Sequence, residues 1–363
     1  MPRRTLLCMR ASRRLGALLA VAALVMVVVP SSPGSAVDAP CVPDIPLVDP
    51  MATPAAQCVA AQLDTWKRDG VMGVGQQLDI ARRHRADSPL KALQPLRPAV
   101  VGFDLGEILY AEKFYGDDPI PYLIRLARSG IILTAGWHPD NPITRGQYDD
   151  RGWTDVVELL DPASEASKRF WRQYERALVD FRRLQDAGVA LIFKPFHEAA
   201  GGWFWWGKPR PVVYKRLFAE MQRRTYESGV HNVLWAYSAA QQNWPGVNDP
   251  IDLIPPNIDL VGLDVYDDEV RDPVDRLPLQ DYRLLSARAP RMALTEVGPA
   301  GSLSGDWNPR VVTDTLRARG LYASFAMLWR DEPDGPLMQI SSLTGGPRWL
   351  ASCPSGLCRL GPP

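Results

Sequence analysis

Short apolar, β-branched runs recur along the chain and alternate with longer stretches of helical periodicity. The runs that predict strands are residues 71–76, 99–105, 131–137, 190–196, 232–238, 258–265, 292–296 and 322–329. Between them, residues 165–187 and 214–228 place apolar side chains three and four positions apart, and Gly229 follows the second stretch as a helix-ending signal. Eight strands that alternate with helices predict a parallel sheet closed into a (β/α)8 (TIM) barrel.

An open, doubly wound α/β sheet is the structural alternative to this barrel. It is disfavoured because no GxGxxG sequence follows the first predicted strand. The predicted barrel occupies residues 70–335. A lead-in over residues 37–69 precedes it, and a C-terminal extension over residues 336–363 is expected to pack on it.

The first 36 residues are organised like a secretory signal peptide. Arginines surround the start of an apolar run from Leu15 to Val29, and small residues precede a plausible cleavage site after Ala36. The run is shorter than the roughly 20 residues that a membrane-spanning helix needs, although an uncleaved anchor remains the alternative. We therefore expect a secreted protein.

Charge and composition narrow the choice of partner. The chain carries 41 basic and 41 acidic residues, and the part after Ala36 carries a small excess of acidic ones without a basic stripe. We therefore expect no nucleic-acid partner and favour a neutral polysaccharide over an anionic one. We also expect a monomer. The chain has four histidines, and none of them has HExxH spacing, so we expect no metal site.

Four cysteines lie outside the predicted signal peptide, at Cys41, Cys58, Cys353 and Cys358. An even number in an exported chain predicts two disulfides, for which three pairings are possible. The local pairing, Cys41 with Cys58 and Cys353 with Cys358, is favoured because each pair flanks a terminal loop that contains proline or glycine.

Polar or aromatic side chains follow nearly every predicted strand. They are Gln76, Asp104, His138, His197 with Glu198, Ser238, Asp264 with Tyr266, Glu296, and Trp329 with Arg330. Barrel enzymes place their chemistry at the carboxyl ends of the strands, so we expect these side chains to meet at one mouth. Glu198, with three tryptophans soon after it, and Glu296 form a pair of strand-end carboxylates, which is what retaining glycoside hydrolysis needs.

These motifs resemble glycoside hydrolase family 26, whose best-known members are endo-β-1,4-mannanases. The resemblance spans about residues 70–335 and is carried by GWHPDNP (136–142), KPFHEAAGGWFWWG (194–207), NVLWAYSA (232–239), VGLDVYDDE (261–269), ALTEVG (293–298) and MLWRDEP (327–333). It implies a double-displacement mechanism without a cofactor, with Glu198 as the general acid/base and Glu296 as the nucleophile.

The same resemblance implies substrate-binding roles for His138, His197, Trp203, Tyr266, Trp329 and Arg330. Tyr266 would hydrogen-bond the nucleophile, and His138 and Arg330 would recognise mannose on the glycone side. Trp203 would flank the leaving group, and Trp329 would form the floor of the cleaved sugar's subsite. Asp264 is interpreted as a hydrogen-bonding carboxylate behind the site, whereas Trp205 and Trp206 fit core and subsite positions equally well.

The chain departs from the family pattern at two places. Lys194 stands where members commonly have arginine, and Ala199-Ala200 replaces a frequent Met-Asn pair. Within the family, a β-1,3-xylanase or a mixed-linkage β-glucanase is the alternative. A non-catalytic carbohydrate-binding barrel is disfavoured because both carboxylates and the aromatic residues are present.

Overall fold

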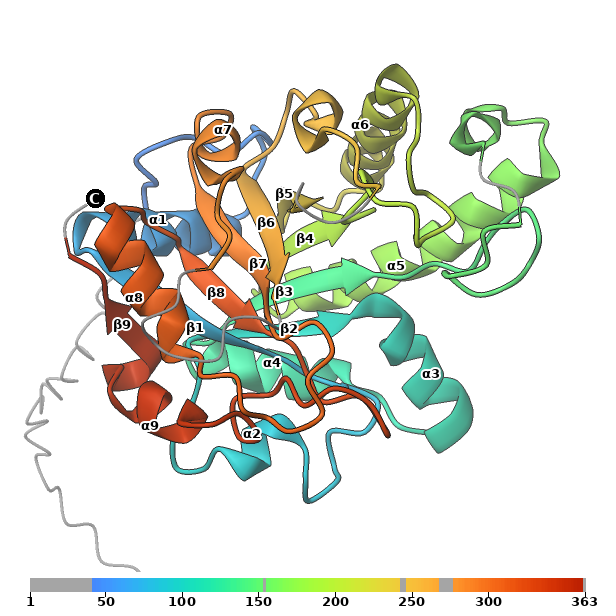
Figure 1. The fold of residues 1–363 in the computed structure, drawn as a ribbon. Helices are drawn as coiled ribbons and strands as arrows, with labels where there is room; N and C mark the ends of the chain where they lie inside the picture. Colours follow the sequence, from blue (N-terminus) through green and yellow to red (C-terminus); the bar gives the residue numbers. More distant parts are fainter. Residues whose placement is uncertain (1–40, 153–154, 242–245, 268–276, 362–363) are drawn as a thin grey trace, which may run out of the picture. The chain divides into compact units, whose positions relative to one another are not determined.

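The protein is described by a computed structural model that covers residues 41–361 apart from 153–154, 242–245 and 268–276 (Figure 1). Eight parallel strands pair in chain order, and β1 closes the barrel by pairing with both β2 and β8. They are β1 (Val71–Gln77), β2 (Val100–Asp104), β3 (Ile132–Trp137), β4 (Leu191–Pro195), β5 (Val233–Ala240), β6 (Leu260–Tyr266), β7 (Met292–Gly298) and β8 (Phe325–Leu328). The predicted (β/α)8 fold is confirmed, while the predicted signal peptide and its cleavage site after Ala36 lie outside the described residues.

Helices surround this barrel in the described part of the chain (Figure 1). They are α1 (Pro54–Arg68), α2 (Pro89–Ala92), α3 (Leu105–Tyr115), α4 (Ile120–Arg128), α5 (Glu165–Asp186), α6 (Pro211–Glu227), α7 (Tyr282–Ser286), α8 (Arg310–Arg319) and α9 (Gly346–Ala351). The two helices expected from periodicity are α5 and α6. Ser164 caps the start of α5, because its hydroxyl accepts hydrogen bonds from the backbone N–H groups of Ala166 and Ser167.

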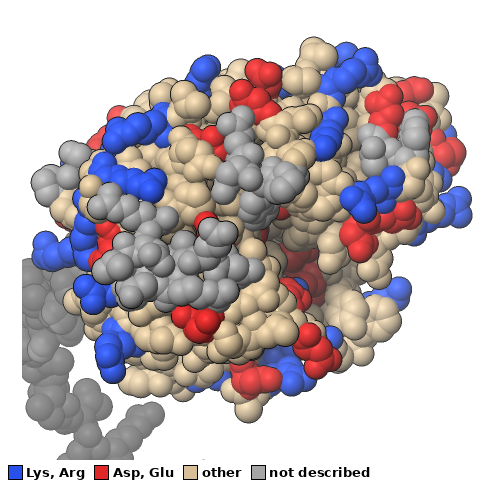
Figure 2. Space-filling view, in the orientation of Figure 1, with Lys and Arg blue, Asp and Glu red and all other residues tan. Residues whose placement is uncertain are grey.

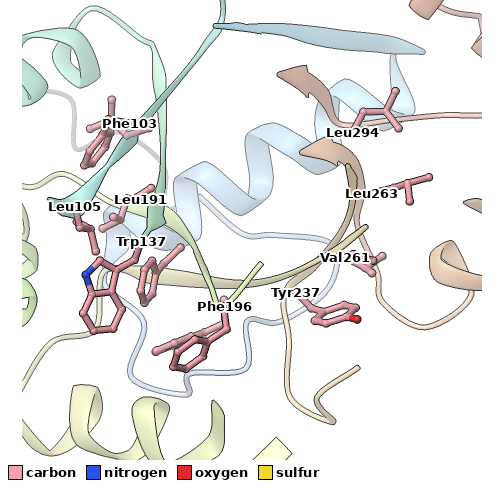
Figure 3. Close-up of a cluster of buried hydrophobic side chains, with 14 of the residues drawn as sticks. Phe103, Leu105, Trp137, Leu191, Phe196, Tyr237, Val261, Leu263 and Leu294 are labelled. Carbon is pink, nitrogen blue, oxygen red and sulfur yellow. The ribbon is translucent and has the colours of Figure 1, made fainter. Parts of the chain in front are cut away.

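Side chains alternate across the strands and form two apolar clusters. The larger cluster lies between strands and helices and includes Phe103, Leu191 and Leu263 (Figure 3). The smaller cluster fills the barrel interior with residues such as Ile132, Ile192, Leu234 and Leu260, which lie at or near the starts of their strands. Polar inward positions are thereby left for the opposite, carboxyl ends.

Helix α1 closes the barrel at the end where the strands begin. Its Leu63 and Trp66 belong to the interior cluster. The ring of Trp66 comes so close to β1 that a Cβ at Gly73 would lie 2.8 Å from it, so only glycine leaves room for the indole. This end of the barrel is therefore filled by apolar side chains.

Both terminal segments of the described chain are tied down by disulfides. Cys41 is bonded to Cys58 and Cys353 to Cys358, so the favoured pairing is confirmed. The second disulfide leads into a ninth strand, β9 (Leu357–Arg359), which was not predicted and which pairs antiparallel with the start of β1. No helix among the described residues is both long and apolar enough to cross a membrane.

Candidate active site

Three acidic side chains from different strands meet at the carboxyl end of the barrel. Glu198 follows β4, Asp264 lies in β6 and Glu296 lies in β7, and one carboxylate oxygen from each lies within 4.8 Å of the other two. All three side chains are buried. Figure 2 shows acidic side chains inside a hollow on one face of the molecule.

An unusual backbone turn presents Glu198. Phe196 and Glu198 have φ values of +50° and +54°, in the left-handed region that non-glycine residues rarely adopt. The turn is held because the Glu198 N–H donates to the Ser238 carbonyl at 2.9 Å and the Trp206 indole donates to the His197 carbonyl at 2.9 Å. Strained backbone that is held in this way is concentrated at functional sites.

The surroundings of Glu198 favour its protonated form. Burial, followed by the nearby carboxylates of Asp264 and Glu296, raises the pKa of Glu198 well above its ordinary value. In the opposite sense, the Trp203 indole N–H donates to Glu198 Oε2 at 2.6 Å and favours the carboxylate. Burial and the two acids outweigh this hydrogen bond.

Glu296 has the opposite environment, because both of its oxygens receive donors. The Tyr266 hydroxyl donates to Oε2 at 2.7 Å, and the Lys194 ammonium group forms a buried ion pair with Oε1. Although burial lowers the pKa of Lys194, the carboxylates of Glu296 and Asp264 raise it further, so the lysine keeps its charge. Both oxygens of Glu296 are therefore held in a fixed orientation.

Asp264 is fully buried beside this pair. The Ser238 hydroxyl donates to it at 2.8 Å and the Thr295 hydroxyl at 2.7 Å. Burial and the neighbouring Glu296 raise the pKa of Asp264 to about 7. A Cβ at Gly262 would lie 2.1 Å from the Thr295 hydroxyl, so glycine at this position leaves room for the hydrogen-bonded group.

Two histidines lie edge to face beside the acids. The ring centroids of His138 and His197 are 4.6 Å apart, and His138 Nδ1 pairs with Asp104 at 2.7 Å. Burial lowers the pKa of His197 well below its ordinary value, so its imidazole is neutral. Its buried Nδ1 has no hydrogen-bond partner within the described ranges.

The tryptophans separate into two groups. Trp205 and Trp206 are almost completely buried and belong to the core, which decides between the two interpretations left open by the sequence. Trp203 and Trp329 remain partly accessible. The Trp329 ring centroid lies 5.8 Å from the Lys194 ammonium nitrogen, which connects this ring to the acidic cluster.

The sequence reasoning missed two ion pairs at the site. Lys194 was noted only as a departure from the family pattern, although its inward alternation with Ile192 could have placed it inside the barrel. Arg330 is paired with Glu107 of α3, which no motif indicated. Burial raises the pKa of Glu107 to about 7, while the Arg330 guanidinium acts in the opposite direction.

The three acids are also the described residues that lie close enough to share a metal ion. Glu296 and Asp264, however, already receive donors from the ammonium and hydroxyl groups around them. The set therefore fits proton transfer and nucleophilic attack better than metal coordination.

Paired carboxyl groups among accessible aromatic rings, at the mouth of a (β/α)8 barrel, define the protein as a glycoside hydrolase. Its sequence matches the model of glycosyl hydrolase family 26 over residues 48–343. The chain belongs to this family, so the resemblance inferred from the motifs is confirmed.

Named relatives agree with this assignment. A mannan endo-1,4-beta-mannosidase of Bacillus subtilis is 26% identical over 279 residues, which cover 71% of this chain and 73% of that one. Another from Thermothelomyces thermophilus is 29% identical over 171 residues, but the match covers only 36% of that protein. The solved structure of Bacillus subtilis mannanase man26 has a TM-score of 0.67 at 19% identity, covers 84% of this chain and 92% of its own, and supports the fold alone.

Proposed function

We propose that the protein is a retaining endo-glycosidase that hydrolyses the β-1,4-mannosidic linkages of mannans. The observation that carries the mechanism is the closeness of Glu198 and Glu296, which have carboxylate oxygens within 4.8 Å of each other. Carboxyl groups lie about 5–5.5 Å apart in retaining enzymes and about 6.5–9.5 Å apart in inverting ones. The short separation favours direct attack by a carboxylate over attack by an interposed water.

Glu198 fits the role of general acid in the first step. Its raised pKa keeps a proton available for the leaving oxygen. After Glu296 has formed the glycosyl ester it carries no negative charge, so one of the two acids that raise the pKa of Glu198 is neutralised. Glu198 can then accept a proton from the water that releases the sugar.

Glu296 fits the role of nucleophile. The Tyr266 hydroxyl and the Lys194 ammonium group each hold one of its oxygens, which restricts rotation of the carboxylate. When the ester forms, the Lys194 ammonium group remains close to the other two acids.

The choice of mannan rests on the relatives, several of which are named mannan endo-1,4-beta-mannosidase. Several of the residues that the family resemblance assigns to sugar binding contact one another or the acidic pair. His138 contacts His197, Trp203 donates to Glu198, and Arg330 follows Trp329. The accessible Trp203 and Trp329 rings offer stacking surfaces for pyranose rings.

Release of reducing sugar from mannan, glucomannan, β-1,3-xylan and lichenan tests the substrate. Hydrolysis of mannan and glucomannan alone is expected. Preferred hydrolysis of β-1,3-xylan or lichenan would replace mannan with one of the alternatives. The anomer released first, followed by proton NMR, tests the mechanism, because a retaining enzyme releases the β-anomer and an inverting one the α-anomer.

Export and a monomeric state are parts of the same proposal. The two disulfides fit an oxidising compartment, and a polysaccharide too large to enter a cell must be degraded outside it. Sequencing the N-terminus of the secreted protein tests cleavage after Ala36. Sedimentation of the mature chain tests the monomeric state.

A further inference from the structure

Helix α3 exposes an aromatic surface that the site described above does not use. Its buried side chains include Leu105, Ile108 and Ala111, whereas Leu109, Tyr110, Phe114 and Tyr115 are between 42% and 58% exposed. The centroids of the Tyr110 and Phe114 rings are 4.6 Å apart, so the rings form one continuous surface. A surface helix normally turns polar side chains outward, so this outer face indicates a ligand.

The aromatic face of α3 adjoins the substrate side of the barrel. Helix α3 begins directly after β2, at the mouth of the barrel (Figure 1). Tyr110 lies between two hollows of about 540 and 520 Å³. Arg330 also lines the first, and His138 and Phe114 line the second. Both hollows therefore contain a residue expected to bind the glycone side of the substrate.

A chain of contacts connects the surface to the acidic cluster. The Lys194 ammonium group pairs with Glu296 and lies 5.8 Å from the Trp329 ring centroid. Arg330 lies 5.9 Å from the same centroid and pairs with Glu107, which belongs to α3. Helix α3 therefore contacts a residue that is expected to bind the glycone side of the substrate.

We propose that the outer face of α3, centred on Tyr110 and Phe114, binds distal sugars on the glycone side of the polysaccharide chain. This inference rests on the proposed function, which sets the direction of the chain. The hollow that Tyr110 shares with Arg330 is also lined by Asp79, Arg82 and Asp87, whose acidic and basic groups can hydrogen-bond sugar hydroxyls. Flat rings flanked by such mixed charges suit a neutral sugar chain.

The test is the dependence of kcat/KM on chain length in the variant Tyr110→Ala/Phe114→Ala. Mannohexaose and soluble mannan reach beyond Arg330, whereas an aryl β-mannobioside occupies only the two sugar positions next to the cleavage point. The variant should lose about ten-fold in kcat/KM on the long substrates, the loss expected for two stacking rings. It should stay within about two-fold of the wild type on the mannobioside.

Leu284→Ala is the matched control, because Leu284 is a similarly exposed apolar residue on α7. It should lose nothing on either substrate. An equal loss on both substrates in the Tyr110/Phe114 variant overturns the inference, because it indicates damage to the fold. An unchanged preference for long chains also overturns it, and sedimentation would then show whether a second copy covers α3.

Failure of the proposed function gives a different result. A wild-type enzyme that hydrolyses neither mannan nor the mannobioside contradicts the mannanase proposal, and this inference with it. A wild-type enzyme that hydrolyses both, paired with a variant that keeps its preference for long chains, contradicts only the role of α3.

Discussion

Glu198 and Glu296 are identical side chains with different surroundings. Glu198 receives one indole N–H and lies near two other acids, whereas Glu296 receives both a phenol and an ammonium group. The first environment favours a protonated carboxyl group, and the second holds both carboxylate oxygens in place. The proposed division into acid and nucleophile therefore depends on neighbouring residues rather than on residue type.

Glu296→Ala should abolish turnover on every substrate because no nucleophile remains. Glu198→Ala should lose about 10²–10⁴-fold on polysaccharide, which needs a general acid, yet keep the first step on an aryl glycoside with a good leaving group. Azide should then restore turnover of the aryl glycoside by Glu198→Ala and yield a β-glycosyl azide. An α-azide from this variant, or a β-azide formed only by Glu296→Ala, would reverse the two roles.

Lys194→Met should lower kcat by about 10²-fold or more, because it removes a charged donor from the nucleophile. Lys194→Arg should keep much of the activity, since it restores the charge and resembles the residue common in the family. Comparing the kcat values of the two variants separates the effect of the charge at position 194 from the effect of side-chain packing there. Equal activity of the methionine variant and the wild type would show that the ion pair has no part in catalysis.

Trp203→Phe should move the basic limb of the pH profile for kcat/KM to higher pH. The indole N–H stabilises the Glu198 carboxylate, so its removal raises the pKa of the group that must be protonated. Loss of stacking lowers the rate at every pH but leaves the position of the limb unchanged. A limb that stays in place or moves to lower pH would contradict the assignment of Glu198 as the acid.

Short terminal elements stabilise the barrel at its edges. The Cys41–Cys58 disulfide anchors the start of the described chain to α1, and Cys353–Cys358 holds the turn that precedes β9. β9 in turn pairs with Val71–Gly73 at the start of β1. The barrel thus depends on segments that lie outside its eight repeats.

Replacing Cys41 and Cys58 with serine should lower the free energy of unfolding by about 3 kcal/mol, and replacing Cys353 and Cys358 by about 2 kcal/mol. The difference arises because the first bond closes a loop of 17 residues and the second a loop of 5. Urea unfolding of both double variants measures the two losses. A larger loss for the shorter loop would show that effects other than loop closure dominate.

For the whole molecule, burial of acids makes stability depend on pH. The folded pKa is about 7 for Asp264 and Glu107 and about 6 for Asp259, in each case raised first by burial. In the unfolded chain these carboxyls ionise near pH 4. The folded state therefore binds more protons between about pH 4 and 7, and stability falls as the pH rises through this range.

The free energy of unfolding should consequently be higher at pH 5 than at pH 8. Asp264→Asn should reduce this difference by roughly 2 kcal/mol, because the variant has no carboxyl group to ionise there. Urea unfolding of both proteins at the two pH values measures the change. Stability that increases towards pH 8 in the wild type would contradict the raised pKa values.

Local patterns were sufficient for much of the architecture and for the main candidates of the site. Short apolar, β-branched runs predicted eight strands that the barrel contains, with ends that shift by up to a few residues. Glu198 and Glu296 could be found because each follows or ends such a strand. The local cysteine pairs were predictable because few residues separate their partners.

Only the tertiary structure decided which of these groups touch. Lys194 and Glu296 are 102 positions apart, and their contact exists because the closed barrel directs both side chains to one mouth. Trp203 and Trp205 are two positions apart, yet one reaches Glu198 and the other is buried in the core. Periodicity records which face of a strand or helix is apolar, whereas contacts between distant polar groups depend on how the strands close around a common axis.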